Sequence, residues 1–158
     1  MALTTLNPTS NQTPDPGQGG NAVTGNINTG HGSTTAVDTT KTCIWTGFPA
    51  AVGQVKTVTL KADWTQDGSI PDGNNSFKIQ YSLNAGSSWN NLLNSTDIIS
   101  PLSGSSQTSL STAQDLTLVR VRDSLIATPI GLAASVTGSV SNIRIEVDTI
   151  APFVVVMM

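Results

Sequence analysis

The segment that sets the class of fold is Gln54-Val55-Lys56-Thr57-Val58-Thr59-Leu60-Lys61-Ala62-Asp63-Trp64-Thr65. One parity is apolar and holds Val58, Leu60, Ala62 and Trp64, whereas the other is polar and holds Thr57, Thr59, Lys61 and Asp63. Successive side chains of a β-strand point to opposite faces of a sheet, so this alternation predicts one buried face and one solvent-facing face. We therefore predict a half-buried strand over 54–65.

Other short segments show strand-like patterns and are separated by Gly, Pro, Asn and Ser. They cover residues 42–48, 76–83, 88–93, 115–123, 133–136 and 140–147, with a short edge strand at Ile98 and Ile99. In 115–123 the apolar parity switches between Leu118 and Val119, which predicts a β-bulge. We find no window with apolar residues at helical spacing. The sequence therefore predicts an all-β protein, a single antiparallel β-sandwich of the immunoglobulin-like or jelly-roll kind with an extended N-terminal arm.

Composition narrows the classes of partner. The 158 residues suffice for one domain, only 11% are charged, and the net charge is −3. The seven Lys and Arg, none of them before Lys41, offer no basic face for nucleic acid. No apolar run is long enough for a transmembrane helix, so no membrane partner is expected. The first eight residues lack the basic and apolar regions of a signal peptide, which predicts synthesis in the cytoplasm or a place in a virion.

Residues 1–40 differ from the rest and are predicted to form a low-complexity arm, followed by the β-sandwich domain at 41–158. This arm contains six Gly and three Pro but no Lys or Arg. It has too little apolar surface to offset an ordering cost of roughly 1–2 kcal/mol per residue. We expect it to be disordered alone and to be held in place by neighbouring subunits, as an assembly device.

The C-terminus ends in an uncharged apolar run that includes Phe153, Val154, Val155 and Val156. Left exposed, such a run would promote edge-to-edge aggregation, so it should be buried. Two arrangements are open. The run pairs as a last strand within its own sandwich, or it is donated to a neighbouring subunit by β-augmentation.

A hairpin is predicted at Tyr81-Ser82-Leu83-Asn84-Ala85-Gly86-Ser87-Ser88-Trp89. A short polar side chain can bond the turn backbone, Gly86 permits positive φ, and Trp89 can pack beneath the hairpin. The stretch resembles the Asp-box of sialidase-like propellers and of assorted β-sandwich modules. Ser82, Gly86 and Trp89 match that pattern, and Asn84 stands where the family has Asp. The resemblance covers nine residues once and implies a hairpin, not sialidase activity.

Chemistry-bearing residues are sparse. Asp63, Asp67, Asp72 and Asn74 surround a Gly-rich loop and are candidate calcium ligands, although their spacing differs from an EF-hand. No other cofactor is expected. His31, the single histidine, lies between two glycines, and Asp115, Asp123, Glu146 and Asp148 are typical of caps or cross-strand ion pairs. Cys43 is expected to be a buried hydrophobe. We predict that the protein is not an enzyme.

Three functions follow from these features. The first is a structural subunit of a larger particle, such as a phage virion protein of the decoration, collar or tail-associated type, that contacts protein subunits through its arm and last strand. The alternative is a carbohydrate-binding or adhesive module, since 77–93 is similar in style to strand pairs of carbohydrate-binding and phage-tail modules. Trp64 and Trp89 are predicted to lie in the core, so Trp45 is the tryptophan left open to a glycan. An extracellular filament subunit is the second alternative.

Overall fold

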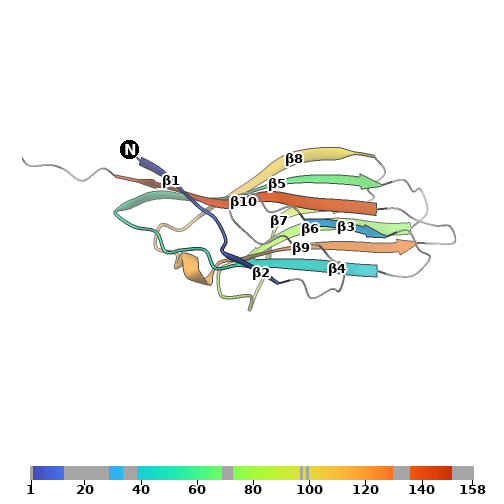
Figure 1. The fold of residues 1–158 in the computed structure, drawn as a ribbon, viewed down its shortest axis with the longest axis horizontal. Helices are drawn as coiled ribbons and strands as arrows, with labels where there is room; N and C mark the ends of the chain where they lie inside the picture. Colours follow the sequence, from blue (N-terminus) through green and yellow to red (C-terminus); the bar gives the residue numbers. More distant parts are fainter. Residues whose placement is uncertain are drawn as a thin grey trace, which may run out of the picture.

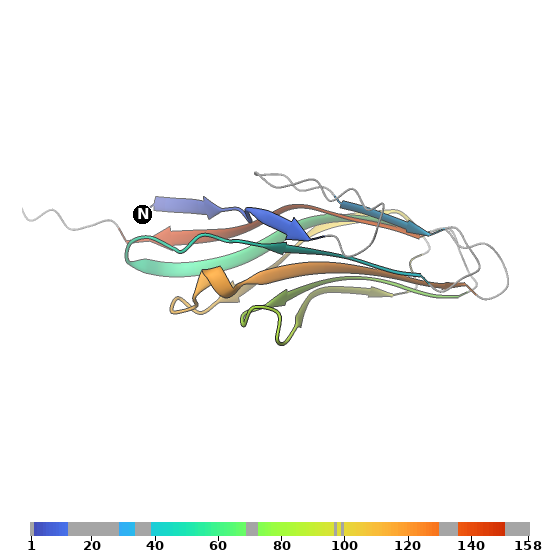
Figure 2. The same ribbon diagram turned by 60° about the horizontal axis from the view of Figure 1, so that its bottom comes forward.

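The protein is a sandwich of two antiparallel sheets. The computed structural model describes residues 2–12, 29–33, 39–68, 73–96, 98, 100–129 and 136–150. Figure 1 shows the strands running along the long axis of the molecule, and Figure 2 shows the sheets as two layers. The predicted all-β sandwich is confirmed.

The first sheet, here called sheet A, is built around the long strand β10. Its strands are β1 (Ala2–Leu6), β3 (Thr29–Ser33), β5 (Val55–Gly68), β8 (Leu102–Leu110) and β10 (Val136–Thr149). The order is β1-β10-β5-β8, with β3 also paired to β10. β1 pairs with residues 145–149 of β10, and β3 pairs with residues 136–140. The two short strands therefore lie one after the other along the same edge of β10.

The second sheet, here called sheet B, carries the candidate site. Its strands are β2 (Ser10–Gln12), β4 (Thr39–Thr46), β6 (Gly73–Ser82), β7 (Asn90–Thr96) and β9 (Arg120–Pro129). The order is β2-β4-β9-β6-β7. A 3-10 turn, η1 (Leu116–Leu118), precedes β9.

The core lies between the sheets and follows the alternation of the sequence. In β5 the side chains of Val58, Leu60 and Ala62 are buried, and in β6 those of Phe77 and Ile79 are completely buried. On the opposite parity of β6, Lys78 and Gln80 are only partly buried and belong to the outer face of sheet B. One parity thus stabilises the sandwich by burying apolar area, at roughly 25 cal/mol per Å², and the other presents polar groups on a rigid surface.

Two local predictions are wrong. The parity switch in 115–123 comes from η1 and not from a β-bulge: Leu116 and Val119 are both buried because residues three apart share one side of a 3-10 turn. A register irregularity lies instead in β10, between Ser141 and Arg144, where Asn142 has φ 51°. The second is the short edge strand predicted at Ile98 and Ile99. Ile98 is buried but belongs to no strand, and Ile99 lies outside the described residues.

Strand β8 was not predicted from the sequence, because its inward parity is weakly apolar. Gly104 is the register partner of Trp64 on the neighbouring strand, and the indole lies beside it: a β-carbon built on Gly104 would lie 3.0 Å from Cζ2 of Trp64. The indole Nε1 of Trp64 also donates to Ser106 Oγ at 3.0 Å. A large side chain on the neighbouring strand therefore supplies an apolar contact that the small residues of β8 do not provide themselves.

Parts of the predicted arm belong to the sheets. β1 and β3 pair with β10, and β2 pairs with β4. Residues 13–28 and 34–38 lie outside the described residues, so the division at residue 40 stays a prediction. Phe153, Val154, Val155 and Val156 also lie outside them. No helix in the described part of the chain is long and apolar enough to cross a membrane.

Candidate functional site

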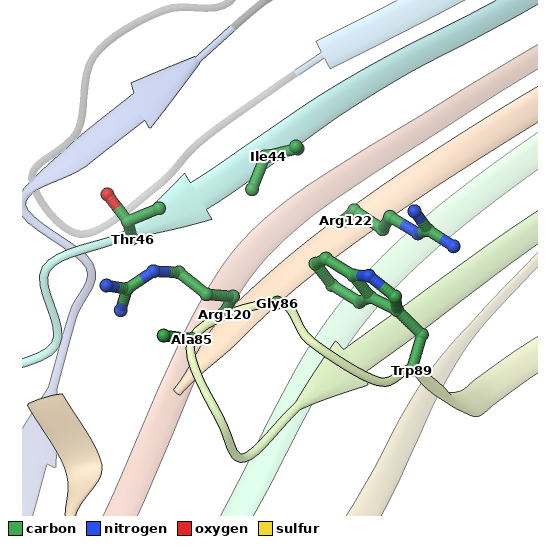
Figure 3. Close-up of a pocket in the computed structure, with 7 residues that line it drawn as sticks. All are labelled: Ile44, Thr46, Ala85, Gly86, Trp89, Arg120 and Arg122. Carbon is green, nitrogen blue, oxygen red and sulfur yellow. The ribbon is translucent and has the colours of Figure 1, made fainter. Parts of the chain in front are cut away.

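A surface pocket of about 510 Å³ lies on the outer face of sheet B, where the loop between β6 and β7 approaches β4 and β9. We call it the Trp89 pocket. It is lined by Ile44, Thr46, Ala85, Gly86, Trp89, Arg120 and Arg122 (Figure 3). Its volume falls within the roughly 300–1,000 Å³ typical of small-molecule sites.

The loop that carries Trp89 is held by a compact set of hydrogen bonds. The fully buried hydroxyl of Ser82 donates to Asn84 Oδ1 at 2.8 Å and accepts the amide N–H of Gly86 at 2.8 Å. Asn84 Oδ1 also accepts the amide of Ser88 at 2.9 Å. Ala85 and Gly86 have φ 57° and 95°, a combination that is easiest where the second residue has no β-carbon. These bonds fix the backbone immediately before Trp89.

The four residues of the predicted hairpin therefore do lie in one hairpin, but Trp89 has a different place from the one expected. It does not belong to the core. Its indole is partly exposed and lies on the outer face, where the guanidinium of Arg122 stacks 4.1 Å from the ring centroid (Figure 3). Arg–aromatic stacking of this kind is favourable because the cation meets the negative face of the ring.

A row of polar side chains continues from Arg122 across the sheet. Arg122 pairs with Gln80 of β6 in the strand register, and its Nε donates to Gln80 Oε1 at 2.9 Å. Gln80 Nε2 in turn donates to Asn91 Oδ1 of β7 at 2.8 Å. Cross-strand neighbours thus link three strands, and the guanidinium is held by a stack on one side and a hydrogen bond on the other.

The opposite wall of the pocket comes from β4 and the start of β9. Ile44 is the register partner of Arg122. Arg120 Nη1 donates to the carbonyls of Thr117 and Val119 at 2.8 and 2.9 Å, and Figure 3 shows its guanidinium extending towards Thr46. The turn η1 therefore fixes Arg120, and Asp115 caps that turn by accepting from the amide of Thr117. The hydroxyl of Thr117 also donates to Asp115 Oδ1, and this bond, followed by the bond from the amide, lowers the pKa of Asp115.

The other two tryptophans do not form a platform with Trp89. Trp45, which the sequence left open to a glycan, is completely buried in the core. Trp64 continues the inward parity of β5 as predicted, although it is only partly buried. Sequence reasoning missed Arg122 and Gln80 as site residues. Their solvent-facing parity was visible, but nothing in the sequence said that the β6–β7 loop would place Trp89 over that face.

The candidate calcium ligands are not brought together in the described residues. Asp63 is engaged on the outer face of sheet A, where it accepts from Asn142 at 2.6 Å and from Arg144 at 3.3 Å. Asp67 lies beside Leu102 in a second hollow, and Asp72 lies outside the described residues. Asn74 belongs to β6. No cluster of three His, Cys, Asp or Glu occurs in the described ranges, and the calcium hypothesis stays a prediction.

The remaining acids and the cysteine have structural surroundings. Glu146 pairs with Lys61 at 2.8 Å and with Arg144 at 3.0 Å. The Lys61 contact does most to lower the pKa of Glu146. Asp123 is fully buried and accepts the amide of Cys43, which is also buried as expected. His31 lies in β3, opposite Gly138.

Comparison with known proteins yields a likeness in overall shape. No protein-family model matches the sequence, and neither does any curated protein. The solved structures include the N-terminal cellulose-binding domain of β-1,4-glucanase C from Cellulomonas fimi, at 13% identity and TM-score 0.34, covering 94% of this chain and 90% of that one. A second, described as CBM4 structure and function, has 10% identity and TM-score 0.36, covering 91% and 94%. Both TM-scores are below 0.5, so neither carries an inference about the ligand of this chain.

Proposed function

We propose that this protein is a non-catalytic carbohydrate-binding module and that its glycan occupies the Trp89 pocket. One observation carries the proposal: a partly exposed indole, apolar side chains and directional hydrogen-bond donors line one hollow on a rigid sheet. A pyranose presents apolar C–H faces and a rim of hydroxyls, so it needs both kinds of contact in a fixed geometry.

The surroundings of the pocket suit a ligand longer than one sugar. The hydrogen-bonded row from Arg122 through Gln80 to Asn91 leads away from the pocket over β6 and β7. Amide and guanidinium groups both meet sugar hydroxyls as donors, and amide oxygens also accept from them. Because each side chain in the row is held by its neighbour, little conformational entropy is lost when a sugar binds.

The lining of the pocket supports binding without turnover. Within the described residues it contains no carboxylate, histidine or cysteine that could act as an acid, a base or a nucleophile. None of the acids of the described chain lines the pocket: for example, Glu146 and Asp63 form ion pairs on sheet A, Asp123 is buried, and Asp115 caps η1.

Glycan-array screening followed by isothermal titration calorimetry tests this function. Trp89→Ala removes the aromatic surface and should weaken binding of any array hit at least tenfold. Leu102→Ala truncates another exposed apolar residue, on sheet A, and should leave the affinity unchanged. Circular dichroism and urea unfolding of both variants check that the sandwich is retained. Absence of binding to every glycan of a broad array, or wild-type affinity of the Trp89→Ala variant, would contradict the proposal.

An assembly subunit is the second candidate, supported by one feature of β8. This edge strand, Leu102-Ser103-Gly104-Ser105-Ser106-Gln107-Thr108-Ser109-Leu110, carries neither a charge nor a proline, the usual protections against edge pairing. Deleting residues 1–40 is not a clean test, because it would remove β1, β2 and β3. Gln107→Lys, which adds a charge at an exposed edge position, should instead abolish any oligomer seen by light scattering. An unchanged oligomer, or a wild-type monomer, would count against it.

A further inference from the structure

The cations on the two outer faces of the sandwich have different partners. On sheet A, Lys61 and Arg144 are paired with Glu146, and Arg144 also contacts Asp63. On the outer face of sheet B, Arg120, Arg122 and Lys78 form no ion pair within the described residues. Asp123 is the acid of the described strands of sheet B, and it is buried on the inner side. A chain of net charge −3 therefore keeps a locally positive face around the Trp89 pocket.

From this we infer that the ligand of the Trp89 pocket is an acidic glycan, whose sugar carboxylate pairs with the guanidinium of Arg122. The inference rests on the proposed function and names the class of sugar. Arg120 supplies a second positive charge to the same lining.

The geometry of Arg122 favours a carboxylate. Its Nε is already used by Gln80 and its plane is fixed against Trp89, which leaves the two Nη atoms without a hydrogen bond in the described residues. Two Nη donors in one plane match the two oxygens of a carboxylate. Partial burial lowers the pKa of Arg122, yet an arginine remains protonated at neutral pH. A partly desolvated cation without a counter-ion gains more from an anionic ligand than from a neutral hydroxyl.

The pocket also has room for the rest of the sugar. Ile44 and Ala85 offer apolar contacts opposite the indole, and the Thr46 hydroxyl can meet a ring hydroxyl. In Figure 3 Thr46 and Ala85 lie on the side of Arg120, whereas the guanidinium of Arg122 lies against Trp89 at the other end of the lining. A single-stranded nucleic acid would also find arginine and an aromatic ring here. However, proteins that bind single strands follow the phosphate backbone with an extended basic groove and stack several bases on aromatic rings. The described outer face offers only one partly exposed indole and three cations, which is too few for such a groove.

Calorimetry with pairs of acidic and neutral sugars tests the inference on the full chain. The probes are trigalacturonate and its methyl ester, 3′-sialyllactose and lactose, and an oligodeoxynucleotide. We expect at least one acidic sugar to bind ten times more tightly than its neutral counterpart, with an affinity that falls as salt is raised. Arg122→Gln should remove that difference in affinity between the acidic sugar and its neutral counterpart. Lys56→Gln makes the same change in net charge on sheet A and should preserve the difference.

The outcomes separate this inference from the proposed function. Equal binding of acidic and neutral sugars, both lost with Trp89→Ala, would overturn the acidic class and keep the carbohydrate function. Tight binding of the oligodeoxynucleotide would overturn the assignment to a glycan. Binding of none of these sugars, together with silence across the array, would overturn both. The comparison of acid with ester in the wild-type protein needs no variant, so it holds even if Arg122→Gln fails to fold.

Discussion

Replacing Gly138 by alanine tests whether the two sheets pack as closely as the structure indicates. Gly138 lies in β10, directly beneath the ring of Phe77 in the opposite sheet. A β-carbon added there would lie 2.6 Å from Phe77 Cε2 and 2.9 Å from Cγ, well inside the 3.4 Å at which ordinary contact begins. Phe77 is completely buried, so its ring has no free space into which it can turn.

The magnitude follows from two opposing terms. Over-packing a well-filled core typically costs about 1–3 kcal/mol. Replacing glycine by alanine stiffens the unfolded chain and returns about 0.4–1 kcal/mol. We therefore expect Gly138→Ala to lower the free energy of unfolding by about 1–2 kcal/mol. With a urea m-value of about 2 kcal/mol per M, in the middle of the usual range for small proteins, the unfolding midpoint should fall by roughly 0.5–1 M.

Urea unfolding followed by tryptophan fluorescence measures this shift, and two comparisons give it meaning. In Gly104→Ala the added β-carbon would lie 3.0 Å from Trp64 Cζ2, but that indole is only partly buried and can move. The Gly104→Ala substitution should therefore lower the free energy of unfolding by less than about 1 kcal/mol. In a Phe77→Leu background the cost of Gly138→Ala should shrink, with a coupling energy of at least about 0.5 kcal/mol. Equal effects of the two glycine variants, or additive effects of Gly138→Ala and Phe77→Leu, would refute the close packing.

Three further outcomes are expected. Ser82→Ala leaves the amide of Gly86 without its acceptor and should destabilise the protein by about 1–3 kcal/mol in urea, whereas a change below about 0.5 kcal/mol would show that the loop does not depend on this hydroxyl. Asn84→Asp keeps the Oδ1 acceptor for Ser88, so its unfolding midpoint should stay close to that of the wild type; a large loss would assign the stability to the Nδ2 group instead. Acid should destabilise the protein through Glu146, because the pKa of this carboxyl is lowered in the folded state from its ordinary value of 4.5. The ionised carboxylate therefore stabilises the fold above about pH 4.5, and this contribution is lost as the pH falls through the folded pKa. Glu146→Gln should therefore flatten the fall of the urea midpoint between pH 5 and pH 3, and an unchanged slope would contradict this role.

The class of fold was predictable because alternation is a local property. The pattern of 54–65 became β5, and that of 76–83 became β6, with the buried faces on the expected side. Both patterns arise from single strands in which apolar side chains repeat every second residue, so no knowledge of partners is needed to read them. The β6–β7 hairpin was equally local, since its turn bonds join residues within four positions of each other.

The candidate site was not predictable in the same way. Trp89 was expected in the core because it fits the residue that packs beneath the hairpin, yet it lies on the outer face, against Arg122 of a strand more than 30 residues away in sequence. Strand β8 was missed because Trp64 of another strand supplies its cover.

The sequence by itself thus determined the alternating strands β5 and β6, their buried faces and the hairpin. Only the tertiary structure decided which strands became neighbours, and so which charged groups of the described residues form ion pairs and which do not. The physical reason is that alternation and turn chemistry act between residues close in the chain, whereas the ion pairs of sheet A and the Arg122–Trp89 stack depend on strand order.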